Sequence, residues 1–444
     1  MRPIAQQPER IIPLAFLGAI TAGTLLLLLP VSRQETGHAS FMVALFTATS
    51  AVCVTGLSVV DTPSYWSDTG LVLITVMTQL GGFGIMAMAT LLSLLVTRRL
   101  GLRGRLVAAA ESSALGVGNV RRVLTRIGLL MLVFEAIVAV PLIARFWTAY
   151  DYPLGRAVWY GIFHAIQAFN NAGFALYRTS MTDFVGDWWI CVPLIVGVLA
   201  GGLGFPVLFE LRHRLRQPFR WSLHTRLTVW GSLGLLIFGS LVILLFEWNN
   251  PYTFGALSFE EKLLAAVFQD SMSRSGGLNS VDIAAMSSET LTIMSVLMFI
   301  GGGSASTAGG IKVTTFLVLA YVIWSEIRGE PDVVVAGRRI SERTQRQAIT
   351  VALLGIAVVG TGALALVVLG DGVIFYRALF DATSAFATAG LTSLPVDTLP
   401  DRAQLVLVVL MFVGRVGSIT VASGIALNTL HRRYRYPEER PIVG

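Results

Sequence analysis

The chain has 444 residues, of which 54% are hydrophobic and only 13% are charged. Soluble domains typically carry about 25% charged residues, so this composition excludes a large soluble domain and predicts an integral membrane protein. The net charge of +7 could suggest nucleic acid, but the basic residues form short clusters between apolar runs. Orientation in a bilayer explains such clusters better, so we expect the lipid bilayer as a partner and no nucleic acid.

Eight apolar segments are long enough to cross a hydrocarbon core, which needs about 20 helical residues. They cover residues 11–29, 69–97, 123–147, 188–209, 225–247, 290–325, 347–369 and 403–430. Between the members of each successive pair lies a moderately apolar stretch that is too short to span, near residues 40–52, 156–170, 260–272 and 373–387. These four stretches are predicted to be re-entrant helices.

Charge predicts the orientation of these crossings. Arginines gather in the N-terminus, the even-numbered loops between crossings and the C-terminal tail, and cytoplasmic loops are enriched in Lys and Arg. Both termini are therefore expected to be cytoplasmic. Acidic residues lean toward the opposite side, where an acidic mouth would attract cations.

The four short stretches are internal repeats. In each, a phenylalanine stands nine or ten positions before a glycine that is followed by Leu or Phe, and the glycines are Gly56, Gly173, Gly277 and Gly390. The chain is thus predicted to be an all-α polytopic membrane protein made of four linked units of helix, re-entrant pore helix, filter loop and helix around a pseudo-four-fold pore. The expected units are 1–110, 111–218, 219–338 with an interrupted second helix, and 339–444 with the C-terminal tail.

Such loops suit a cation pore. Non-helical backbone at membrane depth must be buried in protein or line water, and glycine lets successive carbonyl oxygens turn inward. A ring of carbonyl oxygens can replace the water shell of a monovalent cation. The proposed lining is Val54, Thr55 and Gly56; Asn171, Ala172 and Gly173; Ser275, Gly276 and Gly277; Thr388, Ala389 and Gly390.

At these residues the chain resembles the Trk/Ktr/HKT superfamily of potassium transport proteins, most closely the bacterial KtrB-type membrane subunit. The motifs are SAVCVTGLSVVDT (50–62), QAFNNAGF (167–174), SRSGGLNSVD (273–282), GGGSASTAGGIKVTT (301–315), SAFATAGLT (384–392) and FVGRVGSIT (412–420). In the family, glycine at all four filter positions goes with potassium selectivity, so the resemblance implies K+ as the transported ion. The third loop departs from the family, with Ser275-Gly276-Gly277 in place of Thr-Ala-Gly, which bears on how sharply K+ is discriminated from Na+.

The run from Gly301 to Gly310 interrupts the sixth crossing and contains only small residues. It is either a flexible break below the filter or a site of close helix packing, and the adjacent Lys312 favours the break. The resemblance implies that this segment plugs the pore under the filter and moves to open it. The expected gate residues are Gly302, Gly303, Ser304, Ser306, Thr307, Gly309, Gly310, Lys312 and Arg415.

Three buried charges in apolar segments need a role, because such charges are costly and usually functional. Arg415 either raises a barrier to cations, as the resemblance implies, or forms a structural pair with a carboxylate. Arg274 is expected to brace the filter through Asp381 or Asp270. Glu135, like His164, is predicted to be a packing residue and not a proton carrier.

Regulation is expected to come from other proteins. The chain contains no G-x-x-x-x-G-K-[ST] loop, so we expect it to bind no nucleotide. The resemblance implies a homodimer and a cytosolic ring of RCK-type nucleotide-binding subunits. Arg432, Arg433, Arg435 and the 98–126 loop would either contact that ring or only set topology and bind anionic lipid.

The favoured function is a potassium uptake subunit of the bacterial inner membrane, in which Na+ is either a coupled ion or an activator. Two other functions compete with it. A sodium-coupled symporter of another small substrate would use inverted repeats, whereas these repeats share one orientation. An intramembrane hydrolase would need a nucleophile elbow, and no G-x-S-x-G occurs. We therefore do not expect an enzyme.

Overall fold

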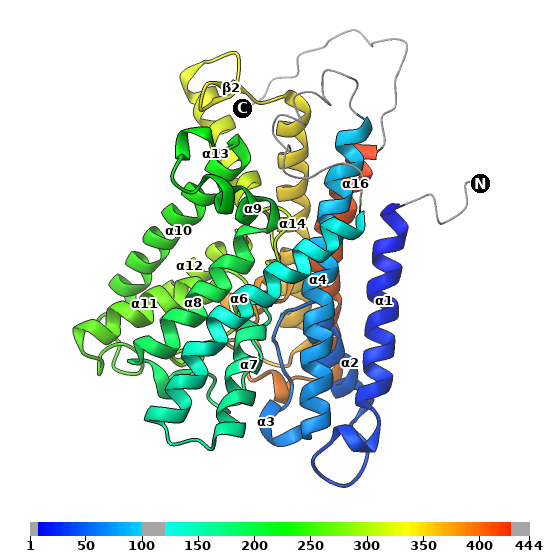
Figure 1. The fold of residues 1–444 in the computed structure, drawn as a ribbon, viewed down its shortest axis with the longest axis vertical. Coiled ribbons are helices and arrows are strands. Elements are labelled where there is room, and N and C mark those ends of the chain that lie inside the picture. The colour runs from blue at the N-terminus through cyan, green and yellow to red at the C-terminus, as the bar shows by residue number, and fades with distance from the viewer. Residues whose placement is uncertain (1–7, 100–119, 428–444) are drawn as a thin grey trace.

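The computed structural model describes residues 8–99 and 120–427, and the described part is almost entirely helical (Figure 1). The longer helices are α1 (Pro8–Leu27), α4 (Asp68–Arg99), α6 (Val120–Ala149), α8 (Trp188–Leu203), α9 (Phe205–Arg214), α10 (Leu223–Glu247), α12 (Ser288–Phe299), α13 (Val313–Arg328), α14 (Glu342–Leu369) and α16 (Asp401–Leu427). Two short strands, β1 (Val334–Val335) and β2 (Arg338–Arg339), pair antiparallel.

Single turns of helix lie in the connections. They are η2 (Pro30–Ser32), α3 (Thr62–Tyr65), η3 (Thr182–Phe184), η4 (Pro218–Arg220), η5 (Ile283–Ala285) and η6 (Val396–Thr398).

Several of the expected crossings are directly recognisable as membrane spans. Within the described residues, α4, α6, α10 and α14 are long and apolar enough to cross a membrane, and the bent pair α8 and α9 makes a fifth span if it is taken as one. The other three expected crossings coincide in sequence with α1, with α12 followed by α13, and with α16. The chain is therefore a multi-pass membrane protein.

The four predicted re-entrant stretches each form a short helix. These pore helices are α2 (Phe41–Val52), α7 (Leu154–Asn170), α11 (Phe259–Ser273) and α15 (Phe375–Ala387). Each is largely buried, and each ends in a loop without regular structure. At about 1.5 Å rise per residue, none of the four could span a hydrocarbon core.

The four units close into a ring in chain order. Within the first unit α2 packs against α1 and α4, and α4 packs against α7 of the second unit. From there α8 contacts α11, α12 contacts α15, and α16 returns to pack on α1 and α2. The pore helices thus lie inside a closed bundle, and the predicted four-repeat architecture is confirmed.

In two of the repeats, the second and the third, the second membrane crossing is broken. The sixth crossing divides into α12 and α13 around residues 300–312, as the small-residue run predicts. The predicted single crossing over 188–209 instead bends by 104° between α8 and α9. Gly204 adopts φ +88° at the bend and Pro206 follows it in the first turn of α9, so one residue reverses the chain and the next fixes a new helix start.

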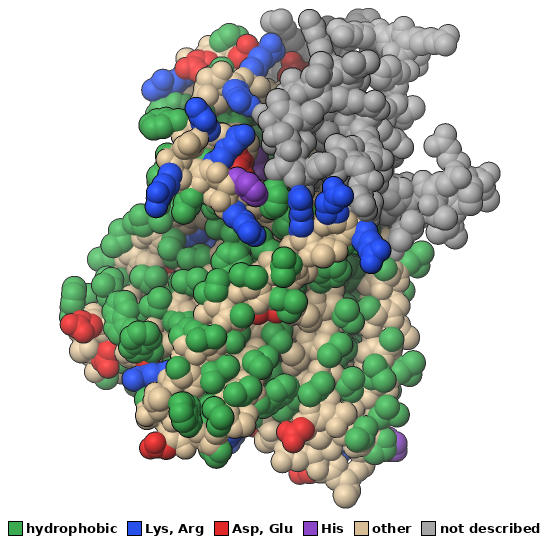
Figure 2. Space-filling model, viewed as in Figure 1, with side chains coloured by type: hydrophobic (Ala, Val, Ile, Leu, Met, Phe, Trp, Pro, Cys, Tyr) green, Lys and Arg blue, Asp and Glu red, His purple; other side chains and the backbone are tan. Residues whose placement is uncertain are grey.

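Charge is distributed unevenly over the surface. Figure 2 shows a wide band of hydrophobic side chains across one face, with Lys and Arg gathered along its upper border and acidic side chains at the lower edge. Large apolar side chains are exposed on several helices, for example Leu241 at 53% and Val140 at 66%. Exposed apolar surface of this extent fits contact with lipid.

A buried carboxylate fixes α12, the first half of the broken sixth crossing. Glu247 ends α10 and is fully buried; its Oε1 accepts hydrogen bonds from the Ser287 backbone N–H (3.0 Å), the Ser287 hydroxyl (2.9 Å) and the Thr290 hydroxyl (2.6 Å). Its Oε2 accepts from Asn250 Nδ2 at 2.7 Å and from the Thr253 hydroxyl. The carboxylate therefore attaches the N-terminus of α12 to α10.

We predict that Glu247→Gln destabilises the protein, because one acceptor oxygen becomes an amide that faces donors. The expected loss is about 2 kcal/mol, measured as a lower thermal unfolding midpoint in detergent. Glu289→Gln is the matched control, since Glu289 is exposed in the first turn of the same α12. Equal midpoints for the two variants would contradict the anchoring role.

Candidate ion pore

Three of the four pore helices end in the same local structure. Val54, Asn171 and Thr388 adopt the left-handed conformation, with φ of 56°, 59° and 48°. In each case that residue donates its N–H to the carbonyl three positions back, and the next residue donates to the carbonyl five positions back: Thr55 to Ser50 (2.8 Å), Ala172 to Gln167 (2.9 Å) and Ala389 to Ser384 (2.8 Å). This is a Schellman motif, and it makes the first expected filter residue the helix stop.

The third loop differs by one residue. Its phenylalanine, Phe268, lies nine positions before Gly277, whereas the spacing is ten in the other loops. Ser275 is again left-handed at φ 70°, but Gly276 and Gly277 both donate to the carbonyl of Met272, at 2.7 and 3.3 Å. The departure seen in the sequence is thus a shortened turn.

The backbone alternates in handedness along every loop. The first and third residues have positive φ, which for the glycines is 92° at Gly56, 79° at Gly173, 72° at Gly277 and 83° at Gly390. The residue between them is not left-handed in any loop. Glycine adopts this conformation without steric cost, and the alternation prevents the carbonyls from pairing as they would along a helix.

The four glycines lie around a common centre. A Cβ atom added at Gly56 would lie 2.9 Å from the Cα of Gly173, and one at Gly173 would lie 2.5 Å from the Cα of Gly277. One at Gly390 would lie 2.9 Å from the Cα of Gly277 and would also collide with the carbonyl oxygen of Thr55, which closes the ring. Only glycine fits at these contacts.

Val54 shows that the ring imposes its geometry on the chain. A β-branched residue at positive φ is a genuine outlier, costing on the order of 1–3 kcal/mol, and it persists only where the surroundings over-determine it. Val54 is fully buried, and its Cγ2 lies against Gly81 of α4. Strain of this kind is concentrated at functional sites.

In two repeats, the residue that directly follows the pore-helix phenylalanine accepts a hydrogen bond from the backbone just after the filter loop. Nε2 of His164 accepts the N–H of Leu176 at 3.3 Å, and Asp381 accepts the N–H of Ser393 at 3.0 Å. Both bonds span twelve positions. His164 also bonds the Tyr160 carbonyl through Nδ1 (2.7 Å), so both of its ring nitrogens have partners, in line with the expected packing role.

Arg274 is paired inside its own repeat. Its Nη2 lies 3.1 Å from Oδ2 of Asp270, one turn earlier on α11, and its Nη1 donates to the carbonyl of Ser232 on α10 at 2.8 Å. Asp381, the other expected partner, instead holds the fourth loop through Thr392 and Ser393. Arg274 and Asp381 therefore have separate partners, because each bonds to the groups nearest to it in the fold.

The break in the sixth crossing is a loop whose two ends are joined by backbone hydrogen bonds. Gly301 donates to the carbonyl of Ile311 at 2.8 Å, Ile311 donates to Phe299 at 3.1 Å, and Val313 donates to Gly302 at 3.0 Å. The intervening residues leave the helical path. Their polar backbone is therefore at membrane depth and needs partners from other elements.

Those partners belong to the filter loops. Thr307 donates its hydroxyl to Oδ1 of Asn171 (2.9 Å) and to the carbonyl of Phe169 (3.2 Å). Gly309 donates its N–H to the hydroxyl of Ser275 at 2.9 Å, and that hydroxyl contacts the carbonyl of Thr388 at 2.9 Å. The loop contacts the left-handed residue of the second, third and fourth filter loops.

The bend between α8 and α9 receives the other side of this loop. Gly303 donates to the carbonyl of Gly202 at 2.7 Å, and Thr307 donates to that of Gly201 at 3.2 Å. At the start of α9, Phe205 donates its N–H to the carbonyl of Ala305 at 3.3 Å. The sequence analysis missed this role, although the run Gly201-Gly202-Leu203-Gly204-Phe205-Pro206 carries the signal for a break.

Both cations near the loop bond to its carbonyls. Nη1 of Arg415, on α16, donates to the carbonyl of Thr307, and Nζ of Lys312 donates to that of Ala308 at 2.7 Å. Arg415 is 2% exposed, and its contacts within the described residues include no carboxylate in ion-pair range. The other residues expected to form a gate, Gly302, Ser304, Ser306 and Gly310, lie in the same loop.

Comparison with known proteins assigns the chain to a family. The family model described as TrkH, cation transport protein, matches residues 15–428. The chain belongs to this family. It is 36% identical over 436 residues to Ktr system potassium uptake protein B of Vibrio alginolyticus, covering 98% of this chain and 94% of the relative. It is 34% identical to the protein of the same name from Bacillus subtilis (strain 168), covering 98% and 97%.

A further relative and a solved structure agree with this membership. Potassium/sodium uptake protein NtpJ of Enterococcus hirae is 30% identical, covering 98% of this chain and 97% of the relative. The crystal structure of the potassium transporter TrkH from Vibrio parahaemolyticus has a TM-score of 0.69 at 20% identity, covering 94% of this chain and 84% of that one. The family consists of transport proteins and not of enzymes.

Several residues that were expected to contact the regulatory ring lie outside the described residues. They are Arg432, Arg433 and Arg435 and residues 100–119 of the basic loop. Glu135 is described: its Oε1 accepts from Asn170 Nδ2 at 3.2 Å, and that amide also donates to Gln79 at 2.7 Å. This network holds the residue next to the second filter loop.

We predict that Asp270→Ala is strongly destabilising, because it leaves the Arg274 guanidinium buried without its counter-charge. The expected loss is about 3–5 kcal/mol, read as a lowered unfolding midpoint and loss of ion flux. Glu342→Ala is the control, since Glu342 and Arg346 form an exposed pair at the same i,i+4 spacing. Such an exposed pair is worth about 0.3–0.5 kcal/mol. A loss at Asp270 no greater than at Glu342 would refute the bracing role.

Proposed function

We propose that this protein is the membrane subunit of a potassium uptake system and conducts K+ through the ring of four filter loops. The observation that carries the proposal is the mutual contact of Gly56, Gly173, Gly277 and Gly390. Three relatives are named as potassium or potassium/sodium uptake proteins, and this supports K+ as the ion.

Selectivity in this proposal comes from backbone oxygens. The twelve expected lining residues include no Asp, Glu, Lys or Arg side chain, so a cation is stabilised by peptide dipoles and by the C-terminal ends of the four pore helices. A cation that moves inward across 100 mV gains about 2.3 kcal/mol, so the membrane potential is sufficient to drive uptake.

The loop at residues 301–310 is the gate of this pore. It lies against the filter residues Asn171, Ser275 and Thr388, and Arg415 fixes it from α16. A guanidinium that is not neutralised by a carboxylate opposes the passage of cations. Opening then requires the loop and Arg415 to move apart.

The assembly follows the same family expectation. The protein is a homodimer in the bacterial inner membrane, with both termini cytoplasmic and a cytosolic ring of RCK-type nucleotide-binding subunits that controls the gate. Na+ takes part either as a coupled ion or as an activator. The repeats extend over 1–110, 111–218, 219–338 and 339–444. The border of basic side chains on one side of the apolar band supports this orientation (Figure 2).

We predict that Gly277→Ser reduces the preference for K+ over Na+ by about tenfold, equivalent to about 1.4 kcal/mol. Gly277 has φ +72°, and a Cβ there would lie 2.6 Å from the Cα of Gly173, so the substitution displaces two filter loops together. Flux of K+, Rb+ and Na+ into proteoliposomes provides the measurement.

The control for this experiment is Gly360→Ser in α14, where a Cβ would meet nothing within 4 Å. It should retain wild-type selectivity. Unchanged selectivity in the Gly277 variant, with normal transport, would reject the filter assignment.

We predict that Arg415→Gln raises K+ flux severalfold in proteoliposomes that contain this chain alone. The change removes a charge and weakens the attachment of Thr307. Arg402→Gln on the same helix is the matched control, because Arg402 is exposed and pairs with Asp371 at 2.9 Å. If the Arg415 variant conducts no faster than the Arg402 variant, Arg415 is not part of the barrier.

A further inference from the structure

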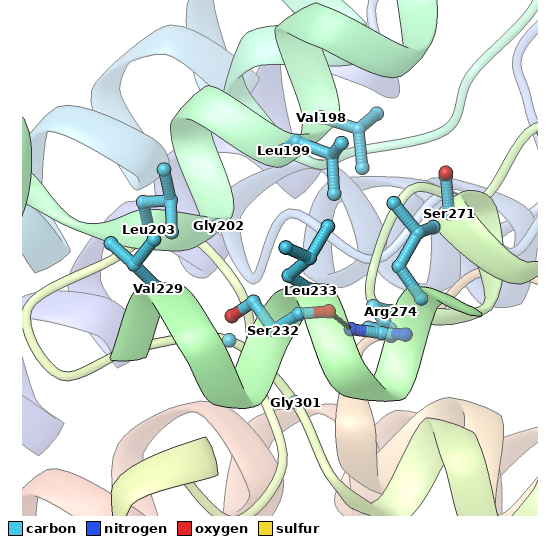
Figure 3. A pocket seen from close by; sticks show the side chains of 12 residues that line it. Val198, Leu199, Gly202, Leu203, Val229, Ser232, Leu233, Ser271, Arg274 and Gly301 are labelled. Carbon is cyan, nitrogen blue, oxygen red and sulfur yellow. Dashed lines mark hydrogen bonds between the residues drawn. The ribbon is translucent and has the colours of Figure 1, made fainter. Parts of the chain in front are cut away.

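An apolar cavity of about 160 Å³ lies beside the proposed gate loop, outside the pore lining (Figure 3). Its walls come from the inner end of α8, the first half of α10, the end of α11 and the start of the loop. Leu199 and Leu203 face Val229 and Leu233 across it, and Gly301 and Gly302 of the loop are also among the lining residues.

The cavity is placed where the hydrocarbon of the bilayer can reach it. Only 17% of the α10 span is buried inside the protein, less than for any other described span. Leu233, which lines the cavity, is 42% exposed, and its neighbours on the outer face, Trp230 and Ile237, are 58% and 54% exposed. Ser232 lies roughly 14 Å along the helix from its N-terminus, near the depth of the lipid chains.

The lining accepts hydrocarbon and disfavours water. The one charged group beside the cavity is the Arg274 guanidinium, which is already held by Asp270 and by the carbonyl of Ser232. The other lining groups are almost all apolar, and an apolar cavity of about 150 Å³ stays dry and takes up benzene or xenon. The other polar side chains of its described lining are Ser232 and Ser271, and the Ser271 hydroxyl already donates to the carbonyl of Val267, so a polar headgroup or a hydrated ion finds too few partners here.

We propose that this cavity binds the end of a phospholipid acyl chain, which packs against the first glycines of the gate loop. The chain is continuous with the lipid that covers the outer face of α10. Gly202 of α8 lines the cavity together with Gly301 and Gly302 of the loop. Gly202 also accepts the N–H of Gly303, so the bound chain shields a hydrogen bond that fixes the loop.

The test uses the full-length protein in nanodiscs made of phospholipid that is brominated at the chain end. Electron cryomicroscopy locates the bromine. In the wild type, bromine density is expected between Leu199 and Leu233, in contact with Gly302. Ser232→Phe fills the cavity with a phenyl ring while keeping the backbone carbonyl that Arg274 uses, and it should lose this density.

Ile237→Phe is the matched control on the same helix, since Ile237 lies on the outer face and does not line the cavity. It should keep the density. Leu199→Phe replaces Ser232→Phe if the latter does not fold. Two wild-type results would overturn the proposal: bromine along the outer face of α10 with none in the cavity, or a second copy of the chain that covers the opening and excludes lipid. Neither of these results measures ion transport, so either would leave the proposed function standing.

Discussion

Peptide groups that leave a helix at membrane depth must find partners within the protein, because lipid offers none. Four filter loops face this constraint at once, and they meet it together. Schellman motifs satisfy the ends of three pore helices, and the glycines pack against one another in a closed ring. The strained φ of Val54 and the left-handed Asn171, Ser275 and Thr388 follow from that ring. In the proposed function, selectivity and fold therefore depend on the same backbone contacts.

The broken sixth crossing faces the same constraint, and its loop finds hydrogen-bond partners on the filter loops. Its loop donates to Ser275 and Asn171 and rests on the carbonyls of the α8–α9 bend. In the proposed function, the residues that shape the filter therefore also hold the gate loop. A conformational change in one is expected to alter the free energy of the other, which gives a physical route for coupling between ion occupancy and gating.

Much of this architecture could be predicted because it is repeated. A glycine at a fixed distance from an aromatic residue is weak alone and strong four times over, and the pore helices and the break after Phe299 were located to within a few residues. The 104° bend at Gly204 was missed, because apolar length alone cannot distinguish one span from two helices. The pairing of Arg274 with Asp270, and not Asp381, was left open because sequence does not give the distances between side chains.

The support that His164 gives to its loop was missed for a related reason, as was the choice of Thr392 and Ser393 as the partners of Asp381. Both acceptors follow the repeated phenylalanine, and the equivalent residues Thr47 and Gln269 are also polar and buried, so the pattern existed in the sequence. Rubidium tests the central claim most directly, because its anomalous scattering locates a K+ substitute in crystals. The account predicts Rb+ on the axis enclosed by Gly56, Gly173, Gly277 and Gly390. Rb+ bound elsewhere in a transport-competent protein, with none inside that ring, would contradict it.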